Sequence, residues 1–231
     1  MQKEKYTYFV LGAVLLLSLI VILKTDSKDT ADKAPSADPM MSFFITSANP
    51  GQGANLGGLL GADAYCQKLA QDAGSTDKTW RAYLSAAPTF TTGVVHAKDR
   101  IGSGPWYNFK GKMIAKDLAE LHENNNLNKD TALTEKGAVV WGRGDEVNMH
   151  DILTGSKSDG TWSTVSSDTT CKNWTSSTTG SAWVGHHDRI GIDDSAPMKS
   201  WNSSHATKGC GMTDLQSTGG SGLLYCFATN E

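Results

Sequence analysis

The sequence has few arginines and no stretch in which basic residues predominate. Its formal net charge is −3, and acidic and basic side chains are mixed along its 231 residues. Proteins that bind nucleic acid present a basic patch or stripe to the phosphates, so this charge pattern argues against a nucleic-acid partner. The chain also has no long acidic tail of the kind found in disordered interaction segments.

The sequence also lacks the motifs of several large enzyme classes. It contains no Gly-x-Ser-x-Gly elbow, no Walker loop, no His-Glu-x-x-His helix and no Gly-x-Gly-x-x-Gly turn after a strand. Each cysteine is expected to serve the structure, which leaves none as a nucleophile. We therefore expect a binding module and not an enzyme.

An apolar segment near the N-terminus predicts a membrane anchor. The run from Tyr6 to Leu23 carries no charge and would extend roughly 27 Å as a helix, enough to cross a bilayer core. A cleaved signal peptide is the alternative, but the residues that follow the run, Lys24 to Ser27, offer no cleavage site. We expect an uncleaved signal anchor over 1–24, a flexible linker over 25–40 and one extracytoplasmic domain over 41–231.

The four cysteines are Cys66, Cys171, Cys210 and Cys226, and no Cys-x-x-Cys pair indicates zinc. Behind a membrane anchor an even number of cysteines indicates disulfides, and three pairings are open. Helical spacing places Cys66 on the apolar face of a helix, whereas Cys226 lies in an apolar run typical of a buried strand. This pattern favours Cys66–Cys226, which leaves Cys171 and Cys210 to fix the long polar region.

The apolar periodicity predicts an α+β fold. Strands are expected at 43–47, 80–84, 138–141, 182–184 and 223–227, and helices at 59–73 and 114–121. Most of the chain between Gly142 and Cys210 is polar, and a loop region this long inside a compact domain is usually functional.

Several segments carry a family likeness. They are Phe44–Ser47, Gly61–Cys66, Trp80–Ser85, Cys171–Ser176 and Leu224–Cys226. Their order resembles the C-type lectin-like fold, and they are more closely similar to the endostatin domain of some collagens and to bacterial endostatin-like surface proteins. The resemblance covers about Phe43 to Phe227. It implies two helices, a twisted and mostly antiparallel sheet, long loops and the disulfides Cys66–Cys226 and Cys171–Cys210.

Two departures from these families limit what the resemblance implies. Sugar-binding C-type lectins use a Glu-Pro-Asn or Gln-Pro-Asp loop and a Trp-Asn-Asp strand to hold calcium, and this chain has neither loop motif. Its Trp201-Asn202-Ser203 lacks the final carboxylate. Calcium-dependent sugar binding is therefore not expected, and the scarcity of arginines argues against the heparin binding of endostatin.

The densest group of chemically versatile side chains lies between Gly185 and His205. The predicted ligand-binding residues there are His186, His187, Asp188, Arg189, Trp201, Asn202 and His205. Imidazole and carboxylate suit zinc or another transition metal, but the spacing matches no ligand motif, and adjacent His186 and His187 would point to opposite faces of a strand. Three interpretations remain open: a polar network that holds a loop, a ligand-binding surface, and a divalent metal site. No other cofactor is expected.

Tryptophan is abundant, with seven residues. Trp80, Trp141 and Trp183 lie in apolar runs and are expected in the core, whereas Trp106, Trp162, Trp174 and Trp201 lie in polar loops and could stack on sugars. Arg143-Gly144-Asp145 spells an integrin-type tripeptide, which has meaning only on an exposed tip.

These observations predict a membrane-anchored module, in the periplasm or on the cell surface, that recognises a glycan or an extracellular or envelope protein. One alternative is a metal-dependent hydrolase that uses His186, His187 and His205, with Asp188 beside them. Another is a structural subunit of an envelope complex.

Overall fold

A computed structural model describes residues 37–166 and 168–229 of the chain. The expected anchor at 1–24 and most of the expected linker lie outside these residues. Within the described ranges no helix is both long and apolar enough to cross a membrane. Residues 37–40, the end of the expected linker, contact the domain: the Asp38 N–H donates to the Phe109 carbonyl, and Lys78 Nζ donates to the Pro39 carbonyl.

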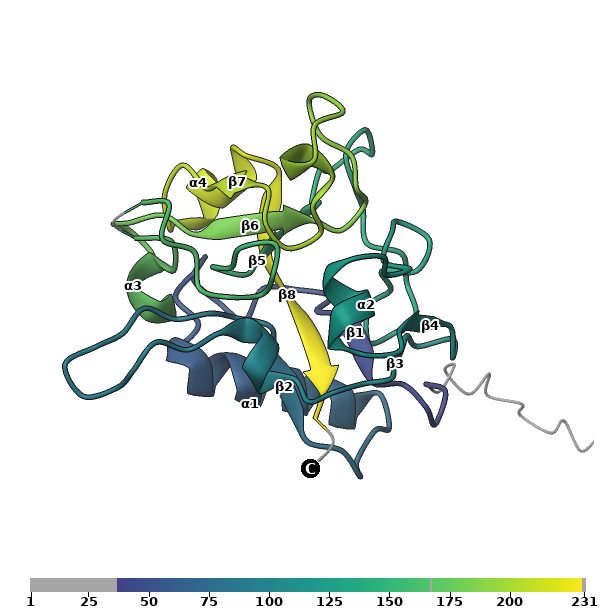
Figure 1. Ribbon diagram of the computed structural model, residues 1–231. Coiled ribbons are helices and arrows are strands. Elements are labelled where there is room, and N and C mark those ends of the chain that lie inside the picture. Colours follow the sequence, from purple (N-terminus) through teal and green to yellow (C-terminus); the bar gives the residue numbers. More distant parts are fainter. Residues whose placement is uncertain (1–36, 167, 230–231) are drawn as a thin grey trace, which may run out of the picture. The chain divides into compact units, whose positions relative to one another are not determined.

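The described residues form an α+β domain with a mixed, mostly antiparallel sheet (Figure 1). The strands are β1 (Phe43–Ile45), β2 (Trp80–Ala82), β3 (Trp106–Tyr107), β4 (Met113–Ala115), β5 (Asp151–Leu153), β6 (Trp183–His186), β7 (His205–Ala206) and β8 (Gly220–Ala228). The helical segments are α1 (Gly58–Asp72), α2 (Leu118–His122), α3 (Cys171–Trp174) and α4 (Met212–Gln216), with 3₁₀ turns at Ala97–Arg100 and Pro197–Lys199. The main sheet runs β1-β8-β5-β6-β7, and β2 also pairs with β8.

Strand β8 forms the centre of the sheet and is buried on both faces. It pairs antiparallel with β1 and β2 and parallel with β5. Because successive strand residues point to opposite faces, Leu224 and Cys226 pack in the core cluster that contains α1, whereas Tyr225 and Phe227 pack in the cluster that contains Leu121 of α2. A strand covered on both sides needs apolar residues without alternation, which explains the continuous run at the C-terminus.

Both predicted disulfides are confirmed. Cys66 in α1 is bonded to Cys226 in β8, and Cys171 is bonded to Cys210. Cys66 lies on the buried face of α1 between Ala62 and Ala70, which are one helical turn away on either side and are also fully buried. The first bond therefore joins the helix to the sheet that it covers.

Two expected elements are wrong. The expected helix at 114–121 is divided, because Ile114 lies in β4 and α2 begins only after Asp117, whose carboxylate accepts the Glu120 N–H as an N-cap. The expected strand at 138–141 is reduced to an isolated pairing of Val139 with Leu133. Apolar residues in a short run do not specify a strand unless a neighbouring strand is available to pair with them.

The segment labelled α3 in Figure 1 is a left-handed turn. Cys171, Lys172, Asn173 and Trp174 have φ values of 46°, 54°, 55° and 66°, a conformation that costs L-amino acids roughly 1–2 kcal/mol each. Contacts on both sides hold the turn: Trp174 Nε1 donates to the Ser85 carbonyl at 2.8 Å, and Cys171 is tied by its disulfide.

Candidate functional site

The predicted ligand-binding residues do not form one surface. His187, Asp188 and Arg189 belong to a polar network that holds the loops together. Trp201 and Asn202 form the base of a groove, and His186 and His205 face a buried aspartate. The polar network, the ligand-binding surface and the metal site that the sequence left open therefore correspond to three different subsets of the predicted residues.

His187 and Asp188 hold backbone groups. His187 is fully buried, and its Nε2 lies 3.2 Å from the Trp141 carbonyl; burial lowers the pKa of its imidazole to about 4. Asp188 accepts the N–H groups of Arg143 at 2.7 Å and Ile190 at 3.0 Å. Burial opposes ionisation of Asp188, but His150 and these two N–H groups outweigh it and lower its pKa to about 2.

Arg189 and the Arg143-Gly144-Asp145 tripeptide have structural partners as well. The Arg189 guanidinium donates to the Leu127 and Lys199 carbonyls and to Asn125 Oδ1. The Asp145 carboxylate accepts the Lys129 ammonium at 2.6 Å and the Gly142 N–H at 2.7 Å. The carboxylate of the tripeptide thus closes a local turn, which does not support display to an integrin.

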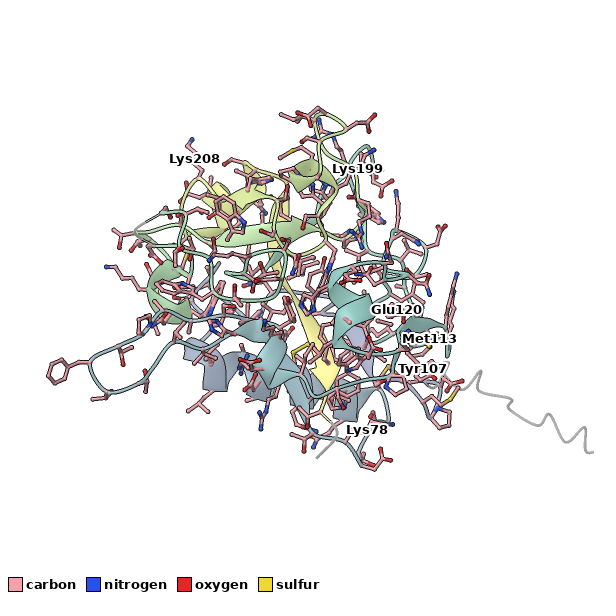
Figure 2. The ribbon with its side chains drawn as sticks, in the orientation of Figure 1. Lys78, Tyr107, Met113, Glu120, Lys199 and Lys208 are labelled. Carbon is pink, nitrogen blue, oxygen red and sulfur yellow. A yellow bond between two sulfur atoms is a disulfide. The ribbon has the colours of Figure 1, made fainter. Side chains whose placement is uncertain are left out.

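A groove of about 540 Å³ lies beside Trp183, and we name it the Trp183 groove. It is lined by His122, Glu123, Ser158, Trp183, Arg189, Ala196, Pro197, Lys199, Ser200, Trp201, Asn202, Ser203 and Ser204. Trp183 is half-buried, and its indole N–H donates to Ser203 Oγ at 3.1 Å. Figure 2 shows Lys199 on the loop that carries the second 3₁₀ turn, so a cationic side chain lies at the rim.

The base of the Trp183 groove is held by buried hydrogen bonds. Asn202 Nδ2 donates to the Tyr83 hydroxyl at 2.9 Å and to the carbonyls of Lys157 and Ser158 at 3.2 Å. Trp201 packs against Tyr83 with a ring-centroid distance of 4.8 Å. Asn202 and Trp201 therefore shape the groove, while its more accessible side chains are left to contact a ligand.

The tryptophans divide differently from the expectation. Trp80 is buried as predicted, Trp183 is only half-buried, and Trp141 is 42% exposed, so its placement in the core was wrong. Trp106, Trp174 and Trp201 come from polar loops but are buried. In this domain the loops therefore contribute much of the buried aromatic core.

The sheet brings three further side chains to one face. Asp151 in β5 is paired with His186 in β6, and Val184 in β6 is paired with His205 in β7. Paired residues on adjacent strands lie on the same face, as do residues two apart along a strand. The register therefore places Asp151, His186 and His205 together, and His150 precedes Asp151 directly. We name these four residues the His–Asp cluster.

The Nε2 atoms of the three histidines surround one oxygen of the aspartate. Asp151 Oδ1 lies 3.2 Å from His150, 3.3 Å from His186 and 3.4 Å from His205. The His150 and His186 rings stack with centroids 4.1 Å apart and an interplanar angle of 10°. Asp151 is 1% exposed, and neither of its carboxylate oxygens has a hydrogen-bond partner.

The electrostatics of the His–Asp cluster favour a negative Asp151. Burial opposes ionisation, but the imidazoles of His186, His205 and His150 hold the pKa of the Asp151 carboxyl below its usual value. Burial also works against a charged His205, yet Asp151 raises the pKa of that imidazole above its usual value. A buried anion faced by three imidazole nitrogens can share a proton with one of them, or can hold a cation together with them.

Among the described residues, His150, Asp151 and His186 have donor atoms that all lie within 4.8 Å of one another, close enough to share a metal ion. Sequence reasoning singled out His186 and His205 but missed His150 and Asp151. The available signal was the His-Asp pair directly before the apolar Ile152 and Leu153, since a strand there would carry both residues into the sheet. No known family model matches the sequence, and no curated protein matches it.

Proposed function

We propose that the chain is a membrane-anchored, extracytoplasmic binding module with a C-type lectin-like, endostatin-like fold, and that it recognises a glycan through the Trp183 groove. The observation that carries the proposal is the groove itself, which presents an accessible indole among hydroxyl and charged side chains. An aromatic face packs against the apolar face of a sugar ring, and polar groups around it bind the hydroxyls. An envelope protein is the alternative ligand.

The disulfides support the location of the domain. Two disulfides form and persist in oxidising compartments and are rare in the cytosol, so they indicate an extracytoplasmic domain. The order of helix, strand and loop cysteines also supports the resemblance to the C-type lectin-like fold. We expect the apolar segment at 1–24 to remain as an anchor. An intact mass that corresponds to a chain beginning near Asp26 or Asp38 would show that the segment is cleaved and would contradict the anchor.

A glycan array with the detergent-solubilised full chain tests the proposed function. The array is run with calcium and again with a chelator of calcium, and we expect binding to be the same in both because the calcium-binding loop motifs are missing. Loss of binding on chelation contradicts the calcium-independent mechanism. Absence of binding to every glycan, together with stable co-purification of one envelope protein, favours the structural subunit instead.

Two variants locate the binding site. Trp183→Ala removes the accessible indole of the Trp183 groove, and loss of one stacked ring is expected to weaken binding about 10-fold or more. Trp141→Ala is the matched control, because Trp141 is exposed but does not line the groove. Equal loss in both variants, or none in Trp183→Ala, refutes the groove as the site. Thermal unfolding of each variant shows whether the domain is intact.

The metal-dependent hydrolase needs a different residue set from the one the sequence indicated. His187 faces the Trp141 carbonyl, whereas His186 and His205 face Asp151. Metal-stimulated hydrolysis that requires Asp151 but not His187 would favour an enzyme.

A further inference from the structure

The hydrogen bonds of the three cluster histidines determine which ring nitrogen carries the proton. His186 Nδ1 lies 2.8 Å from the Met198 carbonyl, and His205 Nδ1 lies 3.1 Å from the Ala206 carbonyl. A carbonyl only accepts hydrogen bonds, so both Nδ1 atoms donate. His150 Nδ1 lies 3.3 Å from a carboxylate oxygen of Asp188, which likewise accepts. In each neutral ring the proton is therefore on Nδ1.

The consequence is a surplus of lone pairs around Asp151. A neutral imidazole with its proton on Nδ1 presents a lone pair at Nε2, and all three Nε2 atoms lie within 3.4 Å of Asp151 Oδ1. The aspartate oxygens have no hydrogen-bond partner, and neither does His186 Nε2. Buried polar atoms without partners are destabilising, so an arrangement of this kind needs an explanation.

Extra protons do not resolve the conflict. One proton on one Nε2 serves a single nitrogen and leaves the other two facing the carboxylate without a donor. Nor can the rings serve one another, because a neutral imidazole with its proton on Nδ1 has no donor at Nε2. A single divalent cation at the centre of the cluster accepts all of the lone pairs at once.

We propose that His150, Asp151, His186 and His205 bind one zinc ion. For His150, Asp151 and His186 the distances agree with tetrahedral zinc: bonds of about 2.0–2.1 Å require ligand atoms roughly 3.3–3.4 Å apart, and Asp151 Oδ1 lies 3.2 Å from His150 and 3.3 Å from His186. His205 Nε2 lies 3.4 Å from Asp151 Oδ1 but outside the group whose donor atoms are all within 4.8 Å of one another, so the His205 side chain moves towards the ion to complete the shell. Imidazole suits zinc and its neighbours in the first transition row, whereas calcium and magnesium prefer oxygen ligands.

The surroundings of the His–Asp cluster match those of established metal sites. Histidines that bind a metal through one nitrogen nearly always donate the other N–H to a carbonyl or carboxylate, and all three do so here. His205 is the most accessible ligand, with 28% of its side chain exposed. A pocket of about 290 Å³ lined by Arg143, Ile192, Met198 and Thr218 reaches the three imidazoles and provides an entry path.

The proposed ion has a structural role. Four protein ligands fill a tetrahedral shell, whereas catalytic zinc usually keeps one position for water. The ligands come from β5, β6 and β7 and from the residue before β5, so the ion joins three strands at one end of the sheet. Because the four ligands meet only in the folded chain, the free energy of metal binding stabilises the fold.

Metal titration of the full chain tests the proposal. The detergent-solubilised protein is stripped with a chelator and titrated with Zn²⁺, and in parallel with Co²⁺, whose visible absorption is strong in a tetrahedral site and weak in an octahedral one. We expect one ion per chain, a tetrahedral Co²⁺ spectrum and a higher unfolding temperature with metal. No stoichiometric binding, or an octahedral spectrum, overturns the proposal.

Variants assign the ligands. Asp151→Asn keeps the shape of the side chain but removes its charge, and His205→Asn removes the ligand at the accessible edge, where the fold tolerates change best. Each is expected to weaken Zn²⁺ binding at least about 100-fold, because loss of a residue that only hydrogen-bonds to a metal ligand already weakens binding by up to about that much. His187→Asn is the matched control, because this neighbouring buried histidine does not face the cluster, and its zinc affinity should stay within about 3-fold of the wild type.

The control and the folding state make each outcome decisive. If His187→Asn loses zinc as His205→Asn does, the set of ligands is wrong. If both Asp151→Asn and His205→Asn bind zinc with the affinity of the wild type, the metal lies elsewhere. Disulfide mapping and circular dichroism identify any variant that fails to fold, and in that case the stoichiometry and Co²⁺ spectrum of the wild type still decide.

Discussion

Replacing Lys172 by glycine is expected to stabilise the protein. Lys172 is exposed and has φ 54° and ψ 53° within the left-handed turn of α3. This conformation costs an L-residue roughly 1–2 kcal/mol, and glycine adopts it without that cost. Glycine gives the unfolded chain more freedom, which lowers stability by about 0.4–1 kcal/mol. The net gain in the free energy of unfolding should be about 0.5–1 kcal/mol.

Lys208→Gly is the matched control. Lys208, labelled in Figure 2, is also an exposed lysine, but its φ is not positive, so glycine brings only the cost in the unfolded chain. This variant should lose about 0.4–1 kcal/mol. Because that cost is common to both variants, the difference between them, about 1–2 kcal/mol, measures the backbone strain of the turn.

Urea unfolding of the oxidised full chain, followed by tryptophan fluorescence, measures both free energies. Trp174 lies in the turn and is buried, and it is one of the seven tryptophans that contribute to the signal. If Lys172→Gly is destabilised as much as Lys208→Gly, Lys172 does not adopt the left-handed conformation in solution and the argument fails. A change in the slope with urea would instead point to an altered unfolded state.

Three further substitutions test the packing and the buried polar groups. A Cβ on Gly185 would lie 1.9 Å from the Trp201 carbonyl oxygen, so Gly185→Ala should lower the free energy of unfolding by about 1–3 kcal/mol; unchanged urea unfolding would show that the two backbones are not in contact. Tyr83→Phe removes the hydroxyl that lies 2.8 Å from His122 Nε2 and accepts the Asn202 amide, which should cost about 1–3 kcal/mol by thermal or urea unfolding; a neutral result contradicts these bonds. Burial lowers the pKa of His122, so the imidazole binds a proton more readily in the unfolded chain than in the folded one. The folded state is therefore destabilised relative to the unfolded state as pH falls from about 6.5 towards the folded-state pKa. The wild type should therefore lose stability relative to His122→Gln between about pH 7 and pH 5, and parallel losses in unfolding assays would refute the shift.

Elements with a long or uninterrupted apolar pattern could be predicted from the sequence. The helix expected at 59–73 is α1 at Gly58–Asp72, and the strand expected at 223–227 lies within β8. Both disulfides followed from these two elements and from the family resemblance. The local pattern was sufficient because helix and strand each have a face that only the core can cover.

The His–Asp cluster could not be predicted in full, because strand register creates it. Asp151 and His205 are far apart in the sequence, and they meet only because β6 pairs with both β5 and β7. β5 has just three residues, too few to show a period. His187 was grouped with His186 as a candidate ligand, but consecutive strand residues face opposite sides, as the sequence already indicated, and this separates their contacts.

The central strand of the sheet is also the last to be synthesised. Among the described strands, β1 and β2 join the main sheet only through β8, and Cys66 has its partner in that strand. The two halves of the sheet therefore cannot combine until residues 220–228 have left the ribosome and, for an exported chain, the translocation channel. Contacts between the two ends of a sequence also form slowly. A nascent chain that stops before β8 consequently presents unpaired apolar strands and a free Cys66 thiol to the chaperones and oxidases of its compartment.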